Sequence, residues 1–306
     1  MIEKPLVSVV IPTYGRPEFL DRCIESVLKQ TYQNIEIFVV DDNDPDTGGR
    51  IATEAEMRKY KENPHIKYLK HNKNMNGSAA RNTGWKQSKG KYITFLDDDD
   101  EIDRTKIEKQ VDCLEKLDAS WGACYTGYRL IKEHGENQIS TEKRSGNCYV
   151  DALMRTMFMG SGSNLFLRKC VVDEIDGYDE SFFRNQDIEF LARALEHYKI
   201  AYIDEILLTI YQEGDRKNRS FEEIEGYTKH YLCKFAEKIS RLNEKDRKRV
   251  IAVISLERFR VALCKKKYKD GIRILKENHV SLLYLVRYMG YLIRRVITKK
   301  SYGFTG

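Results

Sequence analysis

Residues 91–101 are KYITFLDDDDE, a short apolar run that ends in four consecutive aspartates. Aromatic and β-branched residues in a run of this length, entered from the turn signal Lys89-Gly90, are typical of a strand covered on both faces. In an open α/β sheet, the carboxyl ends of the strands border the usual ligand crevice. The sequence therefore predicts a buried strand at residues 92–96 with a ligand site at its acidic end.

The four aspartates, Asp97 to Asp100, would repel one another strongly unless a cation lay among them. Oxygen ligands at a strand end suit a hard divalent ion, Mg2+ or Mn2+, shared with a phosphate group. The structural alternative is a solvated acidic turn before the helix that begins near Arg104. The run alone does not decide between these interpretations, so the rest of the chain has to.

Length and charge both indicate two parts. A chain of 306 residues holds one large domain with an extension, or two domains. Residues 215–306 contain 24 Lys and Arg against 10 Asp and Glu, a net charge of +14, whereas residues 1–214 contain 29 against 37, a net charge of −8. This asymmetry predicts a catalytic domain at residues 1–214 and a basic, surface-binding helical region at residues 215–306.

The cysteine pattern and the absence of targeting signals favour a cytoplasmic protein. The seven cysteines are odd in number and include no C-x-x-C pair, which argues against a disulfide framework and a zinc site. The sequence enters a strand directly after Pro5, without a signal-peptide pattern. No stretch approaches the ~20 apolar residues that a membrane-spanning helix requires.

Strands and helices alternate ahead of the acidic strand. Residues 7–11 and 35–40 are predicted strands, and apolar residues at helical spacing between them, up to Leu28, complete a βαβ unit with parallel strands. The pattern continues with a helix at 46–60, a strand at 66–71 and a helix at 78–87. Because the second strand also ends in carboxylates, Asp41 and Asp42, we expect a doubly wound α/β sheet with acids on one rim.

A second stretch with candidate functional residues lies at residues 175–205. Four apolar residues at helical spacing, Phe190, Leu191, Ala194 and Leu195, predict a helix with one buried face. Gln186 and Asp187 then fall in its first turn. From the pattern alone, Asp187 is an acid that complements the positive end of the helix dipole.

Two long motifs carry a family resemblance. Residues 7–42, VSVVIPTYGRPEFLDRCIESVLKQTYQNIEIFVVDD, followed by NMNGSAARNTGWKQSKGKYITFLDDDDEID at 74–103, resemble the nucleotide-sugar-binding half of family 2 glycosyltransferases with the GT-A fold. The similarity runs over most of residues 5–212. It implies a metal-dependent, inverting transferase that moves a hexose or N-acetylhexosamine from a nucleotide sugar, foremost a UDP-sugar, to an acceptor hydroxyl. It further implies work in bacterial-type cell-surface polysaccharide or glycan synthesis.

The resemblance also implies roles for individual positions. Pro12, Tyr14 and Arg16 would border the nucleoside, Asp42 would accept a hydrogen bond from the base, and Arg81 would lie near the nucleotide. Asp97, Asp98 and Asp99 would form the D-x-D signature, with Asp97 and Asp99 holding Mn2+ or Mg2+ on the diphosphate. Asp187, in a Q-D motif with Gln186, would be the general base that deprotonates the acceptor. The structural alternatives are a surface turn for Tyr14, a helix N-cap for Asp42 and a local ion pair for Arg81.

One departure from the family leaves the metal shell open. Members often carry a histidine or a related polar group shortly after the last sheet strand, whereas here Leu207–Tyr211 is followed by QEGDR, without a histidine. Glu213 or Asp215 would be available as a further ligand, and Arg216 as a diphosphate contact. Upstream, Glu133–Gly146 is predicted to be a mobile loop, and the small residues at 160–164 resemble the wall of the acceptor and donor-sugar site.

Three other functions remain as alternatives. A nucleotidyltransferase that makes an activated sugar is expected to carry a glycine-rich, basic phosphate loop after the first strand, which this sequence lacks. A non-catalytic carbohydrate- or membrane-binding protein is expected to have lost the acids, which are all present. A transferase acting on polyprenyl phosphate would meet an acceptor that is already an anion, and would not need Asp187 as a base.

The region after residue 216 is predicted to be helical, at residues 220–243, 245–266, 268–277 and 281–299. The last helix carries an apolar stripe of Leu282, Leu285, Val286, Met289, Leu292, Ile293 and Val296, with Tyr284, Tyr288 and Tyr291 along one edge. Either this stripe packs on the preceding helices, or residues 281–300 form a peripheral membrane contact with basic residues on anionic lipid. No nucleic-acid partner is expected.

Overall fold

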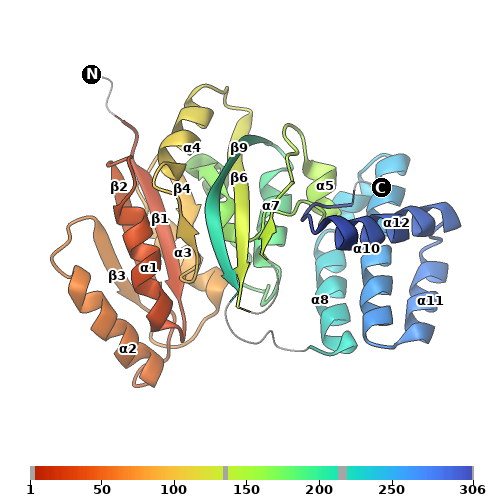
Figure 1. The fold of residues 1–306 in the computed structure, drawn as a ribbon, viewed down its shortest axis with the longest axis horizontal. Coiled ribbons are helices and arrows are strands. Elements are labelled where there is room, and N and C mark those ends of the chain that lie inside the picture. The colour runs from red at the N-terminus through yellow and green to blue at the C-terminus, as the bar shows by residue number, and fades with distance from the viewer. Residues whose placement is uncertain (1–3, 134–136, 213–218, 305–306) are drawn as a thin grey trace. The chain divides into compact units, whose positions relative to one another are not determined.

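The computed structural model describes residues 4–133, 137–212 and 219–304 (Figure 1). The chain divides into two compact units, one of residues 1–148 and 159–213, the other of residues 149–158 and 214–306. The sequence predicts a boundary between residues 214 and 215. The structure adds that the short segment 149–158 goes with the second unit.

One mixed sheet forms the centre of the first unit. Its strand order over the described residues is β3-β2-β1-β4-β8-β6-β9-β5, with β7 beside β6. The strands are β1 (Val7–Thr13), β2 (Ile35–Asp41), β3 (Ile66–Lys70), β4 (Tyr92–Phe95), β5 (Glu101–Ile102), β6 (Trp121–Lys132), β7 (Gln138–Ile139), β8 (Phe166–Arg168) and β9 (Lys199–Gln212).

The predicted α/β class with a mostly parallel core is confirmed. Strands β3, β2, β1 and β4 are parallel neighbours, and β6 is parallel to β9. In contrast, β8 runs antiparallel to both β4 and β6, and β5 and β7 are antiparallel to their neighbours. The stretch expected to be a loop at 133–146 contains β7; its residues 134–136 lie outside the described part.

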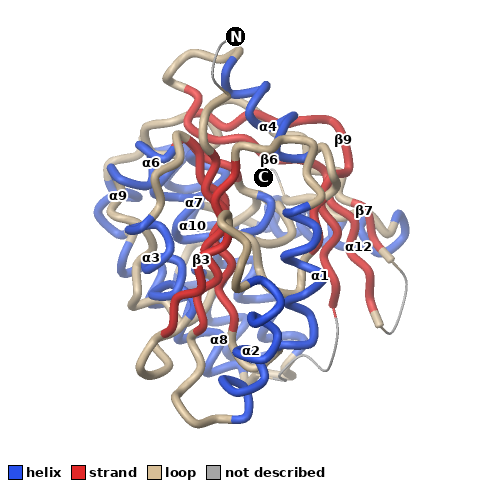
Figure 2. Tube along the Cα trace, turned by 90° about the vertical axis from the view of Figure 1, so that its left-hand side faces the viewer, coloured by secondary structure: helices blue, strands red, loops and turns tan. Residues whose placement is uncertain are grey.

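Helices cover both faces of this sheet, as a doubly wound fold requires. Figure 2 shows α1, α2 and α4 on one side of the strands and α3, α6 and α7 on the other. Their bounds are α1 (Pro17–Leu28), α2 (Gly48–Met57), α3 (Gly77–Gln87), α4 (Lys106–Glu115), α6 (Lys169–Glu174) and α7 (Gln186–Ala194), with the short 3-10 turns η1 (Arg58–Tyr60) and η2 (Gly162–Asn164). Helix α1 begins with Pro17, whose fixed φ suits a first turn, and buries Leu20, Ile24 and Val27.

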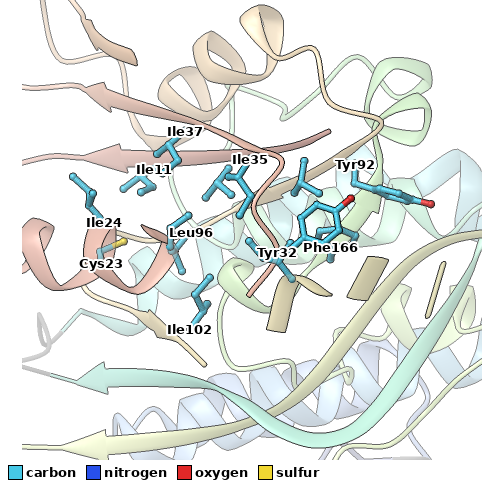
Figure 3. Close-up of a cluster of buried hydrophobic side chains, with 14 of the residues drawn as sticks. Ile11, Cys23, Ile24, Tyr32, Ile35, Ile37, Tyr92, Leu96, Ile102 and Phe166 are labelled. Carbon is cyan, nitrogen blue, oxygen red and sulfur yellow. The ribbon is translucent and has the colours of Figure 1, made fainter. Parts of the chain in front are cut away.

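The apolar run at residues 92–96 lies in the core. All four residues of β4 are buried, and Tyr92 stacks on Phe166 of β8 with ring centroids 5.3 Å apart. Figure 3 shows Tyr92 and Leu96 among side chains from β1, β2 and α1. Burial at about 25 cal/mol per Å2 of apolar surface makes this cluster a main source of stability, and it fixes where the strand and its aspartates end.

Close contact between α3 and β1 determines where α3 carries its side chains. A Cβ atom at Gly84 would overlap the side chain of Val10. Glycine therefore lets this helix lie directly against the strand. Arg81, three residues earlier, is thereby held next to the carboxyl end of β4, where it meets Asp97.

The second unit consists of helices over its described residues. They are α5 (Tyr149–Leu153), α8 (Phe221–Lys234), α9 (Ala236–Ser240), α10 (Glu244–Cys264), α11 (Tyr268–Glu277) and α12 (Leu282–Thr298). A capping box between Ser220 and Glu223 starts α8. The helix expected at 220–243 is two helices, α8 and α9, which meet at the buried Phe235, whose backbone (φ −96°, ψ 5°) departs from helical geometry. Within the described ranges, no helix has the length and apolar content needed to cross a bilayer.

Candidate active site

The first aspartate of the run, Asp97, lies directly after β4 and faces α3. Its Oδ1 accepts a hydrogen bond from Nη2 of Arg81 at 2.5 Å, and its backbone N–H donates to Oγ of Ser163 at 2.9 Å. The side chain of Asp97 remains 26% exposed. One guanidinium therefore balances the charge of Asp97 and leaves part of the carboxylate accessible.

Asp98 and Asp99 share a second guanidinium, that of Arg16. Asp98 is 1% exposed and accepts from Thr13 Oγ1 at 2.7 Å and from Arg16 Nη2 at 2.6 Å, while Asp99 binds Nη1 of the same arginine. Burial raises the pKa of Asp98 to about 7, although Arg16 and Thr13 act in the opposite direction. Arg16 thus joins the end of β1 to the acidic run.

The fourth aspartate, Asp100, has a structural position. Its Oδ2 accepts from Oγ of Ser161 at 2.8 Å and from Oγ of Ser163 at 2.5 Å, and the residue is 1% exposed. Burial raises the pKa of Asp100 well above its usual range, and the charges of Asp97 and Asp99 add to this effect. Asp100 therefore connects the acidic run to the small-residue segment 160–164.

Asp42, at the end of β2, organises the loop before α3. Its Oδ1 lies 2.7 Å from His71 Nδ1 and accepts from the backbone N–H of Met75 at 2.8 Å. Its Oδ2 accepts from Asn74 Nδ2 and from the backbone N–H of Asn76, both at 2.9 Å. A carboxylate has about four lone-pair sites, so the loop and His71 occupy all of them. The helix N-cap after β2 is Thr47, not Asp42.

The first turn of α7 brings Gln186 and Asp187 to the same region as Arg81, as the sequence predicts. Arg81 Nη1 donates to Gln186 Oε1 at 3.1 Å, and the guanidinium lies 5.4 Å from the ring centre of Tyr178. Burial raises the pKa of Asp187, with the charge of Asp97 adding and that of Arg81 opposing. A Cβ atom at Gly162 would lie only 3.6 Å from Cβ of Asp187, which places the small-residue segment beside this carboxylate.

These groups surround one cleft of about 410 Å3. Of the ten residues predicted from the sequence, eight line it: Pro12, Tyr14, Arg16, Asp42, Arg81, Asp97, Asp98 and Gln186. The other two lie next to lining residues, Asp99 on Arg16 and Asp187 beside Gln186 in the first turn of α7. The later candidates Glu213, Asp215 and Arg216 lie outside the described residues.

Five residues of the cleft were not predicted from the sequence. Thr13, Asn74, Asn76, Gly77 and Ala80 also line it. Four of them, Asn74, Asn76, Gly77 and Ala80, belong to the motif NMNGSAARN at 74–82, which carries part of the family resemblance. Gly77 in particular has a steric reason, because a Cβ there would lie 2.9 Å from Arg81 Nη1 and 3.1 Å from Gln186 Oε1.

The oxygen ligands in the cleft fit a hard divalent cation whose remaining ligands would come from the substrate. Over the described residues, no group of three or more His, Cys, Asp or Glu side chains is arranged to hold a metal. Asp97 and Asp99 offer only oxygen, and both are partly exposed, at 26% and 20%. Mg2+ is often bound through one or two carboxylates together with substrate phosphates. Such an ion would therefore need these two side chains and the oxygens of a bound diphosphate.

Comparison with known proteins identifies the family. The model of glycosyl transferase family 2 matches residues 8–175. A relative from Rickettsia prowazekii, described as an uncharacterized glycosyltransferase, is 30% identical over 231 residues, which are 74% of this chain and 70% of the relative. The chain belongs to glycosyl transferase family 2.

Other relatives are matched over a smaller share of their length. An uncharacterized glycosyltransferase from Rickettsia bellii is 32% identical over 212 residues, which are 67% of this chain and 29% of the relative. The putative teichuronic acid biosynthesis glycosyltransferase TuaG of Bacillus subtilis is 34% identical over 132 residues, which are 43% of this chain and 50% of TuaG. The matched region is thus one part of several longer proteins.

Solved structures agree on the fold. The S. aureus protein TarS, residues 1–349 in complex with UDP-GlcNAc, superposes with a TM-score of 0.69 at 18% identity, covering 89% of this chain and 80% of that one. The mannosyltransferase PcManGT from Pyrobaculum calidifontis, in complex with GDP-Man and Mn2+, gives a TM-score of 0.59 at 15% identity, covering 96% and 81%. The expected GT-A fold with a C-terminal helical region is confirmed.

Proposed function

We propose that this chain is a metal-dependent, inverting glycosyltransferase. It transfers a hexose or N-acetylhexosamine from a nucleotide sugar, foremost a UDP-sugar, to an acceptor hydroxyl. One observation carries the proposal: a single cleft where partly exposed strand-end carboxylates, two guanidinium groups and the first turn of α7 meet. Residues 1–214 form the catalytic domain, and residues 215–306 form the basic helical region that holds the enzyme at a membrane surface.

The nucleoside end of the donor would lie along Pro12, Tyr14 and the loop held by Asp42. Tyr14 is 56% exposed, so its ring is free to stack on a base. Because Asp42 already accepts four hydrogen bonds, a base that bonds to it must share or displace one of them. The complexes of TarS with UDP-GlcNAc and of PcManGT with GDP-Man support a nucleotide sugar as the class of donor.

The diphosphate would lie between Arg16, Arg81 and the acidic run. Asp97 and Asp99 are the residues that would hold Mn2+ or Mg2+ there, and the ion when bound supplies positive charge for the leaving diphosphate. Arg16, 45% exposed, is a further cation within reach. Its two carboxylate partners orient it, so it meets the phosphates with little reorganisation.

Asp187 would be the general base. It accepts the proton of the acceptor hydroxyl as that oxygen bonds to the anomeric carbon, on the face opposite the diphosphate. The bond from the anomeric carbon to the diphosphate breaks, and the nucleoside diphosphate leaves with its electron pair. A single displacement inverts the configuration. The raised pKa of Asp187 supports this role, because a carboxylate is a better base when its pKa approaches the working pH.

The acceptor would be a carbohydrate or a lipid-linked glycan in cell-surface polysaccharide synthesis. The name of TuaG, a relative assigned to teichuronic acid biosynthesis, supports this context. We place the enzyme in the cytoplasm, with peripheral contact to the inner face of the cell membrane through residues 281–300.

A panel of UDP- and GDP-sugars tests the proposal. In the presence of Mn2+, a UDP-sugar should raise the melting temperature and be hydrolysed slowly to UDP. If no nucleotide sugar is bound or hydrolysed, the proposal is wrong. Formation of a nucleotide sugar from a sugar phosphate and a nucleoside triphosphate would identify a nucleotidyltransferase instead. Efficient transfer to polyprenyl phosphate would replace the hydroxyl acceptor.

A further inference from the structure

Helix α12 exposes a continuous aliphatic face. Seven of its large apolar residues are exposed, from 40% at Met289 to 77% at Val296. They are Leu282, Leu283, Val286, Met289, Ile293, Val296 and Ile297. At 3.6 residues per turn these positions fall on one side of the helix. A soluble surface normally carries such residues singly, and a contiguous apolar patch marks a contact with something else.

The opposite side of α12 is fixed by aromatic packing. Tyr288 is 5% exposed and lies edge-on to Phe304, with ring centroids 5.2 Å apart. Tyr291 lies edge-on to Tyr302 at 5.5 Å and donates a hydrogen bond from its hydroxyl to the carbonyl of Tyr302 at 2.8 Å. Two of the three tyrosines that the sequence places on one edge, Tyr288 and Tyr291, therefore pack within the second unit and set the rotation of the helix. The aliphatic side is left outward by this packing.

Charge on α12 and the following tail has one sign. Residues 278–306 contain five basic residues, Arg287, Arg294, Arg295, Lys299 and Lys300, and no acid. Arg287 and Arg294 are exposed and seven residues apart, so they lie on one edge of the aliphatic face, two turns from each other. This pattern has the form of a helix that lies in the plane of a membrane, with its charged edge level with the headgroups.

A hollow opens on the same edge. It has a volume of about 430 Å3 and is lined by Gly290, Tyr291, Arg294, Tyr302, Gly303 and Phe304. Gly290 has no side chain to fill the hollow. Arg294 supplies several N–H donors in a planar arrangement that suits a phosphate. Aromatic rings beside a cationic group are common at the level of lipid headgroups.

We infer that α12 is an interfacial helix that binds an anionic lipid surface, with its aliphatic face among the acyl chains and a lipid phosphate at Arg294. This inference deepens the membrane contact of the proposed function and rests on it, but lipid binding needs no sugar donor. A second copy of this chain is a poorer occupant. A two-fold contact would bring the same face of both copies together, and the exposed Arg287 and Arg294, with no acid in residues 278–306, would then oppose the same charges of the other copy.

Vesicle co-sedimentation of the full chain tests the inference. We expect binding to vesicles of phosphatidylcholine and phosphatidylglycerol, and much weaker binding to phosphatidylcholine alone. Binding should fall with salt without vanishing, because only the electrostatic part is screened. The variant Val286→Ser/Ile293→Ser should lose binding at high salt. The matched control Ile51→Ser/Ile206→Ser removes two exposed isoleucines outside α12 and should bind as the parent does.

A charge variant separates the two contributions. Arg287→Gln/Arg294→Gln should lower affinity for the anionic vesicles by roughly five-fold for each charge removed, with little change on neutral vesicles. Equal binding by the parent and the serine variant, or no vesicle binding by the parent, overturns the inference. A parent dimer that the serine variant turns into a monomer, with neither protein on vesicles, identifies a second copy as the occupant and also overturns it. UDP-sugar binding by the same preparations reports separately on the proposed function.

Discussion

His71 and Asp42 are joined by a contact of 2.7 Å between Nδ1 and Oδ1, and Nε2 of the same imidazole lies 2.8 Å from Oγ1 of Thr83. The imidazole therefore links the end of β2 to α3. The loop between them donates two backbone N–H groups to Asp42. One buried histidine thus supports the part of the cleft wall where we expect the nucleobase of the donor.

Replacing His71 by alanine should loosen this wall. The change removes both side-chain contacts and leaves part of Asp42 unpaired in a buried place, which costs about 1–3 kcal/mol of unfolding free energy. Hydrogen exchange at the amides of Met75 and Asn76 should speed up, and UDP binding should weaken. His65→Ala is the control, since His65 is exposed and its imidazole lies 3.0 Å from the backbone carbonyl of Ile35, away from Asp42 and its loop. Unchanged exchange in the loop would contradict this account.

Asp99→Ala should abolish transfer and remove the Mn2+ dependence of UDP binding. The side chain is 20% exposed and its ion-pair partner is Arg16, which is itself 45% exposed, so the fold should survive its loss. Calorimetric titration with UDP, with and without Mn2+, measures the effect, and the exposed Asp112→Ala on α4 serves as the control. If the variant binds UDP with the metal dependence of the parent, Asp99 is not a metal ligand.

Asp187→Asn should reduce kcat by roughly 10²–10⁴, the usual contribution of a positioned acid–base group. Donor binding should remain normal, because Gln186 rather than Asp187 lines the cleft. Asp187→Glu keeps a carboxylate and should recover part of the activity. Full activity of the asparagine variant with a hydroxyl acceptor would remove Asp187 as the base and favour a polyprenyl phosphate acceptor.

The pH profile of kcat should carry the signature of Asp187. The base works as a carboxylate, so activity is lost as pH falls through its pKa, and the raised pKa moves this acidic limb above the ~3.9 of an ordinary aspartate. Asp98 lines the same cleft, and its pKa is about 7. Donor binding, measured over the same pH range, separates the titration of Asp98 from that of Asp187. An acidic limb at the ordinary aspartate value would contradict the assignment.

Lys106 provides a prediction that is independent of function. It is 1% exposed, no described residue hydrogen-bonds to its Nζ, and burial lowers its pKa to about 7. Between pH 7 and the ordinary lysine pKa, the unfolded chain binds this proton and the folded chain does not. Stability should therefore rise with pH across that window, by up to about 1.4 kcal/mol per pH unit.

Lys106→Met, at the first residue of α4, should remove this part of the slope, whereas Lys116→Met, at the exposed opposite end of the helix, should leave it. Urea unfolding at several pH values from 7 to 10 compares the three proteins. Parallel curves for the parent and Lys106→Met would mean that the amine is protonated in the folded state.

The sequence predicted the elements around the cleft because they rest on local patterns. The run at 92–96, the acids after it and the first turn at Gln186 are each visible within a dozen residues. Strand direction is not: β8 pairs antiparallel with β4 through Tyr92–Arg168 and Thr94–Phe166, contacts more than 70 positions apart in the chain. The bonds from Ser161 and Ser163 to Asp100 depend on that same long-range pairing.

The division of charge among the aspartates also had to be seen in three dimensions. A run of four acids suggests one shared cation, whereas the structure gives Asp97 to Arg81, Asp98 and Asp99 to Arg16, and Asp100 to two serines. Each partner comes from a different segment. For α12, five of the seven residues in the predicted stripe are exposed, whereas Leu285 and Leu292 are half-buried. The outward side was decided by Tyr288, whose ring packs on Phe304 in a tail with no pattern of its own.

The segment 149–158 has a consequence for how the chain is made. Its residues Leu153 and Met154 are 0% and 1% exposed, and the carbonyl of Leu153 accepts from the hydroxyl of Tyr231 at 3.2 Å. Arg155 similarly meets Thr228 at 3.2 Å. During synthesis these ten residues leave the ribosome before their partners Thr228 and Tyr231, so the second unit cannot complete its packing until the chain beyond residue 214 has been made. A gene fragment that stops at residue 214 would lack Thr228 and Tyr231, so the short apolar segment 149–158 would be left without these partners.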